Sequence, residues 1–326
     1  MRTWTRTGAA LAATALLATG CGGGSDAESS PETGGGESGP TTVTVADTAG
    51  APLYFLTYGQ QQGFFEDAGV TLDITASTGG ATVIPQLVGG DLDVAGSNVV
   101  SVLIAAGEGL PVRMVAGGTS TSEESEQDFS GLVVRADNPA TSIADLEGQR
   151  IAVNTLRNIN DIVLGAMLEE AGLARDSVTF VELPFPDMAA AIEGGDVAGA
   201  LLIEPFLTIA EQQGMKIIGR PYTELKPGLQ IGTYVMSEQF IGENPDVVEA
   251  FQEGVQATAD SIREDPDAFR AALPEIGDVS PELAEQVRIN LWQGASDEES
   301  LELIQDLMVD YELLDEPVDL DEIVVG

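Results

Sequence analysis

The sequence repeats one strand-and-helix pattern twice, and this repeat limits the possible fold more than any other feature. Val83–Asn98 (VIPQLVGGDLDVAGSN) and Met188–Pro205 (MAAAIEGGDVAGALLIEP) each read as a helix, a Gly-Gly-Asp turn, an apolar strand and then polar residues. An earlier helix ends at Gly63 in the first half and at Gly172 in the second. This alternation predicts two α/β lobes of similar plan, each with a mostly parallel sheet between layers of helices.

Apolar periodicity places the elements of each half. In the first half we expect strands at 43–46, 70–74, 92–95 and 112–116, and helices at 53–66, 81–88 and 99–106. In the second half we expect strands at 151–153, 178–181, 197–203 and 216–218, and helices at 159–167, 188–192 and 205–213.

Two strand-like segments, 131–136 (GLVVRA) and 232–237 (GTYVMS), flank the second half, and we interpret them as the two strands of a hinge. The chain then becomes helical, and Ser296 with Glu299 predicts a capping box at the start of one helix. These C-terminal helices should pack on the first lobe. The sequence therefore predicts that lobe one comprises residues 41–133 and 235–326, and that lobe two comprises residues 134–234.

The first forty residues predict export and a membrane anchor. Arg2 and Arg6 precede a short apolar run, Gly8–Ala18, which is typical of a secretory signal. Small residues then lead to Cys21, the single cysteine of the chain, as in a bacterial lipobox. We expect a signal peptide at 1–20 and a lipidated, flexible tether at 21–40, with the protein on the extracytoplasmic face of the cell membrane. An ordinary signal peptide with an incidental cysteine is the alternative.

The charge of the chain excludes several functions. With 13 basic and 54 acidic residues, the formal net charge is −41, so nucleic acid is not an expected partner. The acidic excess is typical either of a saline habitat or of an acidic extracellular protein. The chain has no histidine, which removes Ser-His-Asp and Cys-His catalysis and most zinc sites. We expect a monomer with no cofactor, no metal site and no enzymatic activity.

Short polar residues follow the predicted strands, at the sheet edge where open α/β sheets bind ligands. Helix N-termini gather at the same edge and offer free N–H groups. The predicted ligand-binding residues are Thr48, Tyr54, Thr78, Gly79, Ser97, Asn98 and Thr119 in lobe one, and Asn154, Thr155, Arg157, Asn158, Asp187 and Glu204 in lobe two.

Several of these residues also have structural explanations, which the sequence leaves open. The alternatives are a loop or cap for Thr78 and Gly79, helix capping for Asn154 and Asn158, a solvated helix start for Arg157, core packing for Tyr54, and an ion pair or cap for Glu204. Asp187 and Glu204 could also flank one cleft as a hydrolytic carboxylate pair, so an enzyme stays open on this ground.

Seven segments together resemble the nitrate/sulfonate/taurine-binding family, which is grouped with the thiamine-pyrimidine-precursor binding proteins. They are GFFEDAGV (63–70), TGG (78–80), LVGGDLDVA (87–95), SIADLEGQRIAVN (142–154), AMLEEAGL (166–173), IEGGDVAGALLIEPF (192–206) and NPDVVEAF (244–251). The resemblance covers nearly all of residues 42–270. It implies a type II periplasmic-binding-protein fold that serves an ABC importer, with permease and ATPase subunits as partners.

The candidate residues leave two classes of ligand open. Arg157 with Thr155 and Asn158 favours a small anion such as a sulfonate, taurine or nitrate, whereas Glu204 and Asp187 favour an amine or an aminopyrimidine. Related enzymes of this fold consume their own histidine, which this chain lacks. We expect hinge closure around a small polar molecule; a thiamine-precursor binder, a sensory subunit and an enzyme on the same fold are the alternatives.

Overall fold

The computed structural model describes residues 39–277 and 279–325, so the predicted leader and Cys21 lie outside the described residues. The chain forms two five-stranded sheets with helices, which confirms the predicted α/β class. The first sheet has the order β2 (Val70–Ser77), β1 (Thr41–Thr48), β3 (Val94–Asn98), β11 (Gly232–Ser237), β4 (Val112–Gly117). The second has the order β10 (Lys216–Gly219), β6 (Ser130–Val134), β9 (Gly199–Ile203), β7 (Arg150–Val153), β8 (Thr179–Glu182).

The two sheets share one plan, as the internal repeat predicts. In the first, β1 pairs in parallel with β2 and β3, and β11 then runs antiparallel between β3 and β4. In the second, β7 pairs in parallel with β8 and β9, and β6 runs antiparallel between β9 and β10. A short antiparallel pair joins β5 (Thr119–Ser120), which follows β4, to β12 (Leu291–Trp292) in the C-terminal segment.

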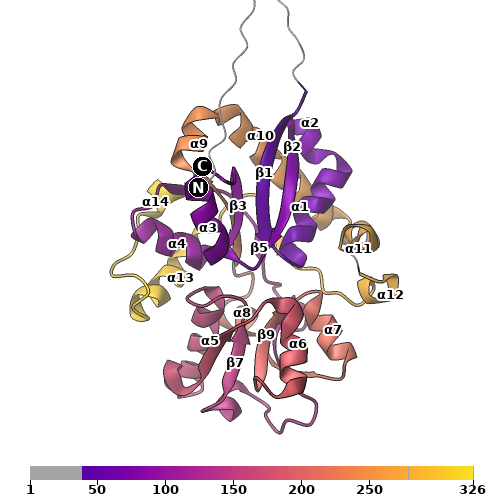
Figure 1. Ribbon diagram of the computed structural model, residues 1–326, viewed down its shortest axis with the longest axis vertical. Helices are drawn as coiled ribbons and strands as arrows, with labels where there is room; N and C mark the ends of the chain where they lie inside the picture. Colours follow the sequence, from indigo (N-terminus) through magenta and orange to yellow (C-terminus); the bar gives the residue numbers. More distant parts are fainter. Residues whose placement is uncertain (1–38, 278, 326) are drawn as a thin grey trace, which may run out of the picture. The chain divides into compact units, whose positions relative to one another are not determined.

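Helices connect and cover the strands (Figure 1). Those between the strands of the first sheet are α1 (Ala51–Gln62), α2 (Phe64–Ala68), α3 (Gly80–Gly89) and α4 (Val99–Gly107). Those of the second sheet are α5 (Ile159–Glu170), α6 (Phe185–Gly194), α7 (Phe206–Gln212) and α8 (Pro221–Leu225). The C-terminal helices are α9 (Glu238–Glu243), α10 (Pro245–Glu264), α11 (Pro266–Ile276), α12 (Pro281–Ala284), α13 (Glu298–Asp310) and α14 (Leu320–Ile323). Short 3-10 turns are η1 (Ser125–Gln127), η2 (Ile143–Leu146) and η3 (Arg175–Ser177).

The repeated Gly-Gly-Asp turn ends a helix in both halves. Gly90 follows α3 with φ 79°, and Gly195 follows α6 with φ 76°. Both glycines adopt the left-handed conformation, which residues with a Cβ enter at a cost, and their N–H groups bond to the last turn of the helix. The turn therefore stops each helix and leads into the central strand that follows, β3 or β9.

Three details differ from the sequence predictions. The helix predicted over 53–66 is broken at Gly63, whose φ of 84° starts a second short helix, α2. The predicted capping box does not form, because α13 begins after Asp297, whose carboxylate accepts a hydrogen bond from Lys226. The two segments interpreted as hinge strands are interior strands of the sheets. The chain therefore crosses from one sheet to the other just before β6 and returns just before β11.

The C-terminal helices complete the first lobe. Helix α10 packs on α1 and α2, where the Phe251 ring lies 5.7 Å from the ring of Phe65, and α13 packs on α4. Of the helices in the described part of the chain, none combines the length and apolar character needed to cross a bilayer.

Candidate functional site

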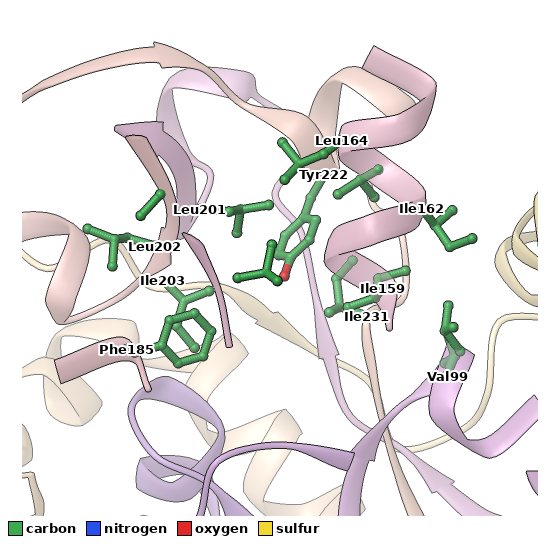
Figure 2. Packing of buried hydrophobic residues seen from close by; sticks show 14 of the residues in the cluster. Val99, Ile159, Ile162, Leu164, Phe185, Leu201, Leu202, Ile203, Tyr222 and Ile231 are labelled. Carbon is green, nitrogen blue, oxygen red and sulfur yellow. The ribbon is translucent and has the colours of Figure 1, made fainter. Parts of the chain in front are cut away.

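A cavity of about 50 Å³ lies between the two sheets, where strand ends from both lobes meet. One water molecule requires about 10–15 Å³ of cavity volume measured in this way, so the cavity admits only a small molecule or part of one. Figure 2 shows several of its apolar and aromatic lining residues among the buried hydrophobic side chains, namely Ile159, Phe185, Ile203, Tyr222 and Ile231. The lining residues are Asp47, Thr48, Pro52, Ser97, Asn98, Gly118, Thr119, Phe129, Asn154, Asn158, Ile159, Phe185, Ile203, Tyr222, Ile231, Gly232, Thr233 and Tyr234.

Nine of the predicted site residues lie at this cavity or in contact with its lining. Six are lining residues: Thr48, Ser97, Asn98, Thr119, Asn154 and Asn158. The other three contact these: the Thr78 carbonyl accepts a hydrogen bond from Asn154, Gly79 lies against the Asn154 amide, and the Thr155 hydroxyl accepts one from Asn158. They come from both lobes because the carboxyl ends of the parallel strands face each other.

The other four predicted residues do not line the cavity. Tyr54 is buried in the core of the first lobe, and its hydroxyl donates to the Gly277 carbonyl at 3.0 Å. Arg157 has a left-handed backbone (φ 54°), which turns its exposed side chain toward a separate hollow beside Glu108. Asp187 is exposed in the first turn of α6.

Glu204 is the fourth, and it forms the structural ion pair that the sequence left open. Its side chain is fully buried and accepts hydrogen bonds from the Thr208 hydroxyl at 2.9 Å and from Arg288 Nη1 at 3.0 Å. Burial raises the pKa of Glu204, and the hydrogen bonds from Thr208 and Arg288 offset part of that rise. Asp187 and Glu204 therefore do not form a carboxylate pair across this cavity.

The lining also includes residues that the strand-end rule missed. Thr233 and Tyr234 come from the amino end of β11, and Phe129 directly precedes β6. Both strands run antiparallel to their neighbours, so they bring their first residues, not their last, to the cavity. Asp47 was missed although a signal was present: it continues the alternation of the buried residues Val43 and Val45 along β1.

A hydrogen-bonded group of three asparagines forms the floor of the cavity on the second lobe. Asn154 Oδ1 accepts from Asn158 Nδ2 at 2.9 Å and from Asn160 Nδ2 at 2.7 Å, and Asn160 Oδ1 accepts from the Tyr222 hydroxyl at 2.6 Å. Asn158 also caps α5, as Asn98 caps α4 on the first lobe. The positive ends of two helices therefore point toward the site, and they favour a negatively charged group of a ligand.

Asp47 lies on the opposite, first-lobe side and is 3% exposed. Burial raises its pKa from the usual value near 4 to about 7, while the Thr48 N–H, at 2.7 Å, and the Tyr234 hydroxyl donate to it and limit the rise. Burial, reinforced by the charge of Asp47, raises the pKa of Tyr234 well above its usual range, so the phenol stays protonated and donates.

Direct contacts hold the two lobes together beside the cavity. Asn154 Nδ2 donates across to the Thr78 carbonyl at 2.8 Å, and the Ala51 N–H donates to the Glu204 carbonyl at 3.0 Å. Gly50 permits the second contact, because a Cβ at that position would lie 2.8 Å from the Glu204 carbonyl oxygen. Arg288, after α12, extends from the C-terminal segment to Glu204 and Glu211 of the second lobe. The structure thus has the two lobes closed on each other.

The arrangement is suited to holding a polar molecule by hydrogen bonds. The described residues contain no group of three or more histidine, cysteine, aspartate or glutamate side chains placed to hold a metal ion. The cavity instead offers amide, hydroxyl and phenol groups, one carboxylate and four aromatic rings. Such a lining fixes the orientation of a bound molecule.

This topology, with two similar α/β lobes and a cavity between them, defines the class of two-lobe periplasmic-binding-protein folds. Within that class, a family model described as NMT1/THI5 like matches residues 51–269, and the chain belongs to this family.

Known proteins agree with this assignment. The alkanesulfonate-binding protein SsuA from Xanthomonas axonopodis pv. citri, solved with MOPS bound, superposes with a TM-score of 0.74 at 16% identity, covering 88% of this chain and 99% of that one. At that identity the likeness shows the fold alone. The taurine-binding periplasmic protein of Escherichia coli (strain K12) is 26% identical over 190 residues, or 58% of this chain. The chain matches little more than half, 56%, of that relative's length.

An enzyme is also among the relatives. The 4-amino-5-hydroxymethyl-2-methylpyrimidine phosphate synthase of Aspergillus parasiticus is 21% identical over 256 residues, which is 74% of this chain and 70% of that protein. The relatives therefore include both a binding protein and an enzyme.

Proposed function

We propose that the protein is the extracytoplasmic solute-binding component of an ABC importer, and that it captures a small polar molecule between its lobes without changing it. The observation that carries this proposal is the cavity itself, which both lobes line with hydrogen-bonding side chains. A ligand that contacts both sides stabilises the closed arrangement over an open one, so binding shifts the population toward closure. A permease would then receive the solute, and an ATPase would drive its import.

The ligand class follows from the lining and the relatives together. Taurine and alkanesulfonates are the solutes named for the relatives, and the helix N-termini of α4 and α5 supply the positive ends that a sulfonate needs. Arg157, which the sequence suggested for this role, faces another hollow. An aminopyrimidine is the second candidate, because the lining includes a carboxylate and aromatic rings and because one relative is a pyrimidine synthase.

Thermal unfolding of residues 41–326 against a panel of solutes tests the proposal. The panel comprises taurine, alkanesulfonates, nitrate, bicarbonate, aminopyrimidines and riboflavin. A solute present at 100 times its Kd should add about 2.7 kcal/mol to the free energy of unfolding. Asn158→Ala should abolish that gain, whereas the exposed Asp187→Ala should keep it. Equal loss in both variants, or conversion of the solute to a product detected by mass spectrometry, would contradict capture in this cavity.

We also propose that Cys21 carries the membrane anchor and that residues 21–40 are the flexible tether between it and the lobes. In a bacterial host, the full chain should be found in the membrane fraction, with an N-terminal peptide whose mass includes a diacylglyceryl group. Cys21→Ala should prevent this modification. A wild-type chain without added lipid mass on Cys21 would argue for an ordinary signal peptide.

A further inference from the structure

Asp47 is a buried carboxylate with no basic partner among the described residues. It lines the cavity, and the interactions that act on it come from Thr48 and Tyr234. The lining contains no lysine or arginine from the described part of the chain. The glutamate that is also buried near the lobe contact, Glu204, has Arg288 as its partner. Asp47 is therefore the acidic group of this region whose charge is left uncompensated.

The neighbouring strands hold the Asp47 carboxylate in place. On β3, Gly96 lies so close that an added Cβ would be 2.1 Å from the carboxyl carbon of Asp47, so only glycine fits there. On β11, the Tyr234 hydroxyl donates to the same carboxylate. A carboxylate has about four acceptor sites. Thr48 and Tyr234 occupy two of them, and the cavity is the remaining open side.

Charge decides what this group can accept. Burying an unpaired carboxylate is costly, and a cation in contact with it repays that cost, whereas an anion adds repulsion in a site of low dielectric constant. The aromatic rings of the lining, Phe185, Tyr222 and Tyr234, also favour a cation over their faces. The Asp47 side of the cavity thus suits a positively charged group.

We propose that Asp47 is the specificity-determining residue of the site, and that the captured solute carries a small cationic group, such as an ammonium or a protonated amine, that binds its carboxylate. This inference rests on the proposed function and narrows it. A solute that also carries a sulfonate would place the sulfonate at the N-termini of α4 and α5. A sulfonate without a cationic group would bind only weakly.

Matched pairs of solutes test this requirement. Titration calorimetry of the protein at pH 7 compares taurine with ethanesulfonate. It also compares choline with its uncharged carbon analogue, 3,3-dimethylbutan-1-ol. A hydrogen bond to a charged group contributes about 1.5–3 kcal/mol, so taurine, whose ammonium carries N–H donors, should bind about 10- to 100-fold more tightly than ethanesulfonate. Choline has no N–H on its quaternary nitrogen, so it should bind more tightly than its uncharged analogue through charge alone. Equal binding of both members in each pair, or no binding by the cationic members, would overturn the proposal.

Proton release gives a second readout that a merely structural Asp47 would not produce. The other titratable groups of the lining are Tyr222 and Tyr234, whose pKa values burial raises further from neutrality. Asp47, with a pKa of about 7, is therefore half protonated at pH 7. A cation should expel up to about half a proton per molecule bound, whereas an anion should draw in up to about half a proton. Titrations in two buffers with different ionisation enthalpies distinguish these signs.

Three variants complete the test. Asp47→Asn should lose the preference for the cationic member and all proton exchange, while Asp187→Asn, which removes an exposed carboxylate outside the cavity, should retain both. Tyr234→Phe removes a donor to Asp47, so the pH of maximal proton release should move upward. Proton uptake on binding, or unchanged binding by Asp47→Asn, would refute the role of Asp47 and leave solute capture intact. Failure of the whole panel above would instead refute the proposed function.

Discussion

At the scale of single residues, Asp47 should give the protein a distinctive dependence on pH. Its pKa is raised to about 7 in the folded chain, whereas the unfolded chain has the usual value near 4. Between these values the folded protein holds a proton that the unfolded chain releases, so this group makes the protein less stable as the pH rises from about 4 to about 7. Above pH 7 the effect is complete and constant.

Asp47→Asn should remove this dependence. Without solute, the variant should be more stable than the wild type at pH 8. The difference in the free energy of unfolding should grow by about 1 kcal/mol per pH unit between pH 4 and pH 7. Urea unfolding of both proteins across that range measures the difference, in which the effects of the other carboxylates cancel. A difference that does not change with pH would show that the Asp47 carboxyl titrates normally.

Asn154 joins the lobes and organises the floor of the cavity. In Asn154→Ala the Thr78 carbonyl loses its donor across the lobe contact, Asn160 Nδ2 loses its acceptor, and Asn158 Nδ2 loses one of its two acceptors. The free energy of unfolding of the variant should be about 1–3 kcal/mol lower than that of the wild type, because buried polar groups are left unpaired. The variant should also bind solute more weakly. Asn138→Ala is the control outside the cavity, and similar losses in both variants would contradict this role.

The candidate site was partly predictable at this scale. The polar residues that follow β1, β3 and β7 were located correctly because the carboxyl ends of parallel strands meet at one edge. The residues of β11 were not, because nothing in the sequence shows that this distant strand inserts antiparallel between β3 and β4. The backbone turn at Arg157 and the burial of Glu204 also depend on contacts that form only in the folded chain.

At the scale of elements, the ion pair between Glu204 at the end of β9 and Arg288 after α12 should stabilise the lobe contact. Arg288→Met leaves Glu204 buried without its cation and should lower the free energy of unfolding by about 1–3 kcal/mol, less than a fixed charge would cost because Glu204 can take up a proton. Solute affinity should fall as well, since the two residues hold the lobes together.

Glu204→Gln introduced with Arg288→Met should recover part of the loss, because no buried charge then remains. Arg263→Met is the matched control: its ion pair with Asp260 is exposed, and its removal should change the stability by less than about 0.5 kcal/mol. If Arg288→Met is as mild as this control under calorimetric or urea unfolding, the ion pair has no part in joining the lobes.

Most elements follow from the sequence because they depend on local signals. The apolar periodicity and the repeated Gly-Gly turns correctly indicated the strands and helices of both halves and their parallel pairing. The errors have local physical causes. Gly63 adopts the left-handed conformation, which divides one helix into two. Asp297, which precedes α13, pairs with Lys226, which is far away in the sequence. The limits of the two lobes stay a prediction.

At the scale of the whole molecule, charge should make stability depend on salt. The formal net charge of −41 favours expansion of the chain through self-repulsion, and the screening length falls from about 10 Å at 0.1 M salt to about 3 Å at 1 M. We expect Tm to rise by several degrees over this range, as measured by calorimetry. Potassium and tetramethylammonium chloride should act alike, because screening depends on ionic strength. A Tm that falls with added salt would argue against self-repulsion.

The order of strands in the two sheets has a consequence for biosynthesis. Every strand of the second sheet lies within residues 130–219, whereas the first sheet needs β11, which spans residues 232–237 and separates β3 from β4. As the polypeptide emerges from its N-terminus, the second sheet can therefore assemble as soon as its own segment is available. The lobe that begins first must wait, with β3 and β4 unjoined, until the intervening lobe has been made. Vectorial folding should thus finish the middle of the chain before the beginning.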